Sequence, residues 1–158
     1  MLEAFPTDWR TALLLVPHPD DPEYGCAAAV AKWTSHGKTV RYALACRGEV
    51  GIAGMPPEEA GPLREAEQLR SAAMVGVHDV QFWDFPDSQI RDTPELRAKI
   101  ADTITALAPD LVLTVYSGPE WAPGHRTSAT TSSSRRRLRR HMTRSPNRRG
   151  GCSRTGRK

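Results

Sequence analysis

Three polar side chains follow a short apolar run near the N-terminus. Residues 13–17, LLLVP, predict a strand buried on both faces, and His18, Asp20 and Asp21 come within the next four positions. Burying such groups is costly unless something pairs with them. Imidazole and carboxylate are suitable ligands for zinc, and a catalytic zinc typically has three protein ligands and one open position. The segment therefore indicates a metal site.

Pro19 restricts the backbone within HPDD, so we expect His18 and Asp21 to face one point and Asp20 to face another. Asp20 would then be free to accept a proton from water that the metal activates. The alternative is that Asp20 and Asp21 only cap the helix that follows.

The elements around this segment alternate between strand and helix. Strands are expected over residues 13–17, 39–46, 80–85 and 111–116, and helices over residues 23–36, 62–75 and 93–107. Such alternation predicts an α/β fold, a Rossmann-like and mostly parallel sheet with flanking helices. The pattern stops after the fourth strand, so we expect the sheet to be incomplete at the C-terminus.

Four loops follow the carboxyl ends of these strands, where ligands bind in open α/β sheets. They contain residues 18–21, residues 47–49, Asp87 and residues 118–124. We expect them to converge on one rim. A nucleotide-binding function is disfavoured, because no G-x-G-x-x-G follows the first strand.

The chain resembles the zinc-dependent N-acetylglucosaminyl deacetylases, the LmbE-like or PIG-L family, whose usual signature is AHPDDE. The resemblance covers residues 12–124, and its segments are PHPDD, CRGEVG, LREAEQLRSAAMVGV, FWDFPDSQI and LVLTVYSGPEW. It implies a zinc ion held by His18, Asp21 and a later histidine, with Asp20 as general base. It also implies removal of an acetyl or other acyl group from the amine of an amino sugar, including intermediates and conjugates of mycothiol.

The same resemblance implies that Arg64 and Asp87 contact the substrate. Arg64 matches the helix arginine of the family, and Asp87 matches its carboxylate near the sugar hydroxyls. The alternatives are that Arg64 is a surface residue beside Glu65 or Glu67, and that Asp87 is only a turn residue.

Two departures from the family pattern affect the site. Pro22 occupies the place of the glutamate that usually follows the two aspartates, and Glu23 comes one position later. The H-x-D-H motif that usually supplies the third zinc ligand is missing, and His125 is the candidate that remains nearby. The other histidines, His36, His78 and His141, fall at positions away from the predicted rim.

Charge divides the 158 residues into two unlike parts. Residues 1–124 hold 10 Lys and Arg against all 18 Asp and Glu, a net charge of −8, whereas residues 125–158 hold 12 Lys and Arg and no acid. We expect a deacetylase-like domain over residues 1–124 and a basic, disordered tail over residues 125–158. No membrane-spanning run or signal peptide is expected, and three cysteines without metal-type spacing favour reduced thiols in the cytoplasm.

Three functions remain open. The first is a zinc-dependent hydrolase with a small-molecule amino-sugar substrate, and the second is a truncated or frameshifted relative with weak or no activity. A one-base shift near residue 124 would allow the string Ala-Pro-Asp-Gln-Arg-Asp-His, which contains an Asp-His pair. The third is a polyanion-binding protein that uses its basic tail, although that tail has no aromatic residues for stacking on nucleic acid. The oligomeric state stays open, and an incomplete sheet predicts self-association.

Overall fold

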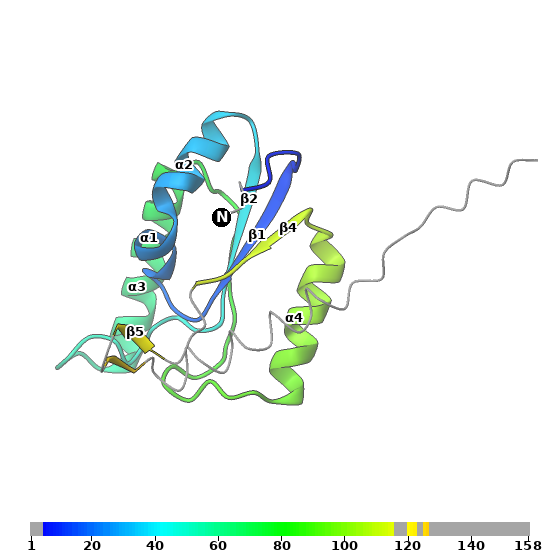
Figure 1. The fold of residues 1–158 in the computed structure, drawn as a ribbon. Coiled ribbons are helices and arrows are strands. Elements are labelled where there is room, and N and C mark those ends of the chain that lie inside the picture. The colour runs from blue at the N-terminus through cyan, green and yellow to red at the C-terminus, as the bar shows by residue number, and fades with distance from the viewer. Residues whose placement is uncertain (1–4, 116–119, 123–124, 127–158) are drawn as a thin grey trace, which may run out of the picture.

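A computed structural model of the chain describes residues 5–115, 120–122 and 125–126. Four parallel strands form its main sheet in the order β3-β2-β1-β4 (Figure 1). The strands are β1 (Thr11–Val16), β2 (Thr39–Leu44), β3 (Val80–Phe82) and β4 (Leu111–Leu113). The predicted α/β fold is confirmed.

Helices cover both faces of this sheet. On one face lie α1 (Asp21–Gly25), α2 (Ala27–Ser35) and α3 (Pro57–Met74), and on the other lies α4 (Pro94–Leu107) (Figure 1). Thr93 begins α4 as its N-cap, because its hydroxyl accepts the Leu96 N–H at 3.3 Å. The sheet is thus the middle layer of three.

Strand alternation divides the apolar core between the two faces. Leu14 and Val16 of β1 pack with residues of α2 and α3, whereas Leu13 and Leu15 pack with residues of α4. All four side chains are 1% exposed. A strand buried on both faces accounts for the unbroken apolar run that the sequence shows.

The chain changes direction in the sheet between β1 and β4. It passes from β1 to β2 to β3 on one side, and then crosses through α4 to place β4 on the other side of β1. Ligands in such sheets bind beyond the carboxyl end of the strand at this switch point. His18 follows β1 and therefore lies at that position.

Several element boundaries differ from those expected. The helix predicted over residues 23–36 is two helices, because Cys26, with φ −157° and ψ 11°, is not helical and interrupts the run. Helix α3 begins at Pro57 rather than at Pro62, and Pro62 lies inside it. Both prolines are compatible with a helix start, so the sequence alone could not choose between them. Strands β2, β3 and β4 end earlier than expected.

A second, smaller sheet pairs β5 (Glu120–Ala122) with β6 (His125–Arg126) in antiparallel fashion. The first two residues of the expected disordered tail therefore form a strand. The expectation for residues 127–158 lies outside the described residues. Within the described part of the chain, no helix combines the length and the apolar character needed to cross a bilayer.

Candidate metal and active site

His18 and Asp21 face each other at the end of β1. The His18 backbone N–H donates to Asp21 Oδ2 at 3.0 Å, and His18 Nδ1 lies 3.6 Å from the same oxygen. Two donors on one tetrahedral zinc ion are about 3.4 Å apart. The separation of the two atoms is therefore close to that of two ligands on one metal ion.

The other nitrogen of the His18 ring faces Asp87, in the loop after β3. His18 Nε2 lies 3.3 Å from Asp87 Oδ1. The Asp87 side chain is 7% exposed and accepts hydrogen bonds from the backbone N–H groups of Val50, at 3.2 Å, and Ser88, at 2.6 Å. A metal-ligating histidine commonly donates its second N–H to such a carboxylate, which fixes the ring orientation.

The three acidic groups around His18 determine its charge. Burial lowers the pKa of the imidazole, but the hydrogen bond and charge of Asp21, with the charges of Asp87 and Asp20, outweigh burial and raise the pKa above its usual value. The site thus favours a positive charge on the ring, or a cation held beside it.

The Asp20 carboxylate has a different partner from that of Asp21, which lies beside His18. The Asp20 backbone is left-handed at φ 76°, and its Oδ2 accepts a hydrogen bond from Arg64 Nη2 at 2.9 Å. Asp20 occupies the N-cap position of α1, yet its side chain makes no capping hydrogen bond. The capping alternative is therefore wrong for Asp20.

Arg64 reaches Asp20 from α3 through a narrow space. Its Nη2 also donates to the Pro19 carbonyl at 3.0 Å. A Cβ atom at Gly48 would lie 2.8 Å from Arg64 Nε, and one at Gly51 would lie 2.5 Å from Arg64 Nη1. The two glycines of the loop after β2 therefore make room for the guanidinium group.

These side chains border one small polar cavity of about 230 Å³. Its lining comes from the loops after β1, β2 and β3 and from α3: His18, Asp20, Gly48, Val50, Gly51, Arg64, Asp87 and Ser88. The predicted convergence of loops is borne out for these three strands. Residues 118 and 119, in the fourth loop, lie outside the described residues.

Sequence reasoning did not identify Cys46 as part of the site. Single ligand atoms of His18, Cys46 and Asp87 lie within 4.8 Å of one another, so these residues could also hold a metal ion. However, burial raises the pKa of the Cys46 thiol to about 12, and the thiol donates to the Pro17 carbonyl at 3.3 Å. Imidazole with carboxylate is a donor set that suits zinc, and His18 with Asp21 supplies it on the other side of the ring. The sequence signal that could have identified Cys46 is its position at the end of the second predicted strand.

His125, the expected third ligand, lies in β6, but its side chain is outside what the structure describes. Its role as a ligand stays a prediction. His36 lies at the far end of α2, where its Nδ1 is 2.6 Å from the Lys32 carbonyl oxygen.

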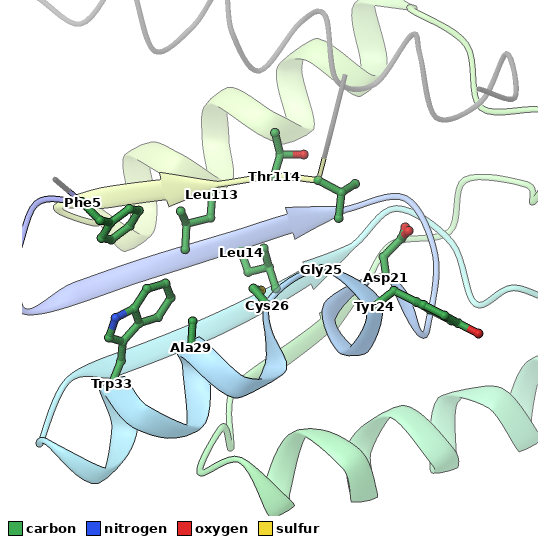
Figure 2. Close-up of a pocket in the computed structure, with 11 residues that line it drawn as sticks. Phe5, Leu14, Asp21, Tyr24, Gly25, Cys26, Ala29, Trp33, Leu113 and Thr114 are labelled. Atoms are coloured by element: carbon green, nitrogen blue, oxygen red, sulfur yellow. The ribbon is translucent and has the colours of Figure 1, made fainter. Parts of the chain in front are cut away.

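A second cavity, of about 590 Å³, has a mainly apolar lining that includes neither His18 nor Asp20. Figure 2 shows the residues that line it. This cavity lies between β4 and helices α1 and α2, where Trp33 and Leu113 face each other across it. Asp21 and Tyr24 border one end. The polar cavity is the candidate active site, because His18, Asp20 and Asp87 line it. Asp21 contacts His18 from the border of the apolar cavity.

Residues 13–134 match the family described as GlcNAc-PI de-N-acetylase, PIG-L. The chain belongs to this family. The match includes the HPDD segment, the loop after β2, all of α3 and Asp87, which are the parts that build the polar cavity.

Curated relatives in this family are named as deacetylases. The chain is 32% identical over 123 residues to a probable N-acetyl-alpha-D-glucosaminyl L-malate deacetylase 2 of Bacillus anthracis, covering 73% of this chain and 54% of the relative. It is 32% identical over 108 residues to the diacetylchitobiose deacetylase of Thermococcus kodakarensis, covering 67% of this chain and 40% of the relative. This chain thus spans about half the length of these relatives.

The fold also matches a solved deacetylase structure. The N,N'-diacetylchitobiose deacetylase of Pyrococcus horikoshii superposes with a TM-score of 0.68 at 24% identity, covering 79% of this chain and 47% of that one. This likeness supports the α/β architecture described above.

Proposed function

We propose that this protein is a zinc-dependent hydrolase that removes an acetyl group from the amine of an N-acetylglucosamine-containing substrate. The observation that carries the proposal is that the two aspartates of HPDD have different partners. Asp21 faces His18, whereas Asp20 borders the polar cavity and its carboxylate is held by Arg64. Family membership supports the substrate class.

In this proposal, His18 and Asp21 hold the metal ion, with His125 as the third ligand. Zinc supplies a Lewis acid that polarises an acyl carbonyl and makes water more acidic. Asp87 orients the His18 ring through Nε2.

Asp20 would accept the proton of the attacking water. Its Oδ1 accepts none of the hydrogen bonds described here, and the side chain is 55% exposed, so the carboxylate is accessible from the cavity. The Arg64 guanidinium holds this carboxylate in place through a charge-assisted hydrogen bond. The substrate-contacting roles of Arg64 and Asp87 remain part of the proposal, because both line the cavity.

The runner-up is a relative of these enzymes with an incomplete site. It predicts weak metal binding and little activity, because the third ligand and a proton donor for the leaving amine would be missing. Binding of a polyanion by the basic tail stays a prediction, since residues 127–158 lie outside the described part. Free thiols at Cys26 and Cys46 support the proposed location in the cytoplasm.

Zinc content and amine release test the proposal. The purified full chain should contain close to one zinc per chain and release free amine from N-acetylglucosamine conjugates. Asp20→Asn should keep the zinc and lower kcat by about 100-fold or more. His125→Ala should lose the zinc. Full-length protein with little zinc and no amine release would favour the runner-up and reject the proposal.

A further inference from the structure

Three side chains of α3 contact the segment that carries Asp20. Arg64, Gln68 and Ser71 are spaced four and three residues apart, so they lie on one face of the helix. Arg64 binds the Asp20 carboxylate, Gln68 binds the Asp20 backbone, and Ser71 binds Glu23. This face of α3 therefore supports the HPDD segment from behind.

Gln68 is the central residue of this contact. Its side chain is buried, at 2% exposure, and both ends of its amide are used. Gln68 Oε1 accepts the Asp20 backbone N–H at 2.8 Å, and Gln68 Nε2 donates to Glu23 Oε1 at 3.0 Å. A flipped amide would place a donor against a donor and an oxygen against an oxygen. Glu23 thus fixes which end of the amide faces Asp20.

The backbone of Asp20 needs such support. Its φ of 76° is left-handed, a conformation that is unfavourable for a residue with a Cβ atom. Such a conformation persists where the surroundings determine it, and here a buried hydrogen bond fixes the N–H. This backbone conformation also determines where the carboxylate points.

We propose that Gln68 is a positioning residue that holds the Asp20 backbone so that its carboxylate faces the polar cavity, with Glu23 orienting the Gln68 amide. The inference rests on the proposed function, because it assigns Asp20 the proton transfer. It extends that function by assigning a role to Glu23. Glu23 lies one position after Pro22, which occupies the place of the usual family glutamate.

Amide hydrogen exchange of the intact protein tests the positioning without any need for activity. In Gln68→Met, the Asp20 amide should exchange about 10-fold faster or more, because its buried acceptor is gone. The amide of Ala43 in β2 should be unaffected. An unchanged Asp20 exchange rate in a folded Gln68→Met variant would overturn the proposal.

A swapped pair distinguishes positioning from general stabilisation. Gln68→Glu alone places two carboxylates side by side, so the Asp20 amide should exchange faster and kcat should fall about 10- to 100-fold. Adding Glu23→Gln restores one donor between the two side chains and keeps an acceptor for Asp20. The double variant should recover both quantities with KM little changed. If the double variant recovers neither, the proposal is wrong.

Thr103→Val is the control for lost stability. Thr103 is buried in α4 on the other face of the sheet, where it donates to the Lys99 carbonyl. This variant should be less stable than the parent, but its Asp20 amide exchange rate and its kcat should equal those of the parent. If no variant, including the parent, releases amine, the proposed function fails, and the exchange rates alone still decide whether Gln68 positions Asp20.

Discussion

The two aspartates of HPDD carry the same functional group but meet different partners. Asp21 lies beside His18, where a positive charge is favoured, and Asp20 lies beside Arg64. Asp87 adds a third carboxylate that is nearly buried and contacts the far side of the His18 ring. Metal binding at this site should therefore depend on residues that do not themselves touch the metal.

Asp87→Asn should weaken zinc binding by about 10- to 100-fold. Asparagine keeps a hydrogen-bond acceptor but loses the negative charge beside His18 Nε2, so the ring is held less firmly. Competition with a chelator measures the affinity. Asp84→Asn is the matched control, because the Asp84 side chain is 86% exposed and pairs with Arg47. Equal zinc affinity in the Asp87 variant and the parent would contradict the orienting role.

Gly51→Ala should lower kcat/KM about as much as Arg64→Ala, because the new Cβ would occupy the space of Arg64 Nη1. We expect a loss of about 10- to 100-fold, with a small change in thermal midpoint, since the end of a flexible side chain can move. The double variant should lose no more than either single variant. Additive losses would show that Gly51 acts independently of Arg64.

At the scale of elements, one exposed carboxylate connects the starts of two neighbouring strands. Asp110 Oδ2 accepts the backbone N–H groups of Arg10 and Thr11, both at 2.9 Å, and the Thr11 hydroxyl at 3.0 Å. These hydrogen bonds, led by that from the Arg10 N–H, lower the pKa of Asp110. They fix the start of β4 beside β1, although β4 itself has only three residues.

A lowered pKa in the folded state makes this contact depend on pH. Its contribution to stability is complete above the pKa of the unfolded chain, about 3.8, and is lost as the pH falls through the lower folded value. The thermal midpoint of the parent should therefore fall more steeply below about pH 4 than that of Asp110→Asn. Asp102→Asn, at an exposed site of α4, should keep the steepness of the parent. Parallel curves for the parent and Asp110→Asn would contradict the prediction.

At the scale of the whole molecule, the apolar cavity beside β4 is the main surface that the polar site does not use (Figure 2). Large apolar side chains near it are exposed, with Phe5 at 48% and stacked on Trp33. Exposed apolar patches of this kind favour association. The self-association expected from the incomplete sheet stays a prediction.

We expect sedimentation velocity of the full chain to show species larger than the monomer that increase with concentration. Ala29→Glu, which places a charge in the cavity lining, should shift the protein toward the monomer. Ala28→Glu is the control, because Ala28 is exposed on the same helix and is not part of that lining. A monodisperse monomer in the parent at all concentrations would refute the prediction.

The sequence by itself determined the α/β class, the alternation of parallel strands with helices and the position of HPDD at the end of the first strand. These features follow from local patterns. Burial of a strand on both faces leaves a continuous apolar run, and burial of one face of a helix leaves apolar residues spaced three and four apart. The sequence also predicts different roles for Asp20 and Asp21, and in the structure the two carboxylates have different partners, Arg64 and His18.

Only the tertiary structure decided which distant residues support that segment. Gln68 lies 48 residues from Asp20, and Cys46 and Asp87 follow the ends of β2 and β3, so no local spacing connects them to His18. The helix break at Cys26 and the start of α3 at Pro57 were likewise seen only in the structure, because the prolines at positions 57 and 62 both suit a helix start. The loops after parallel strands meet at one edge of the sheet, and the order of the strands decides which loops are neighbours. Burial of the apolar core favours that order.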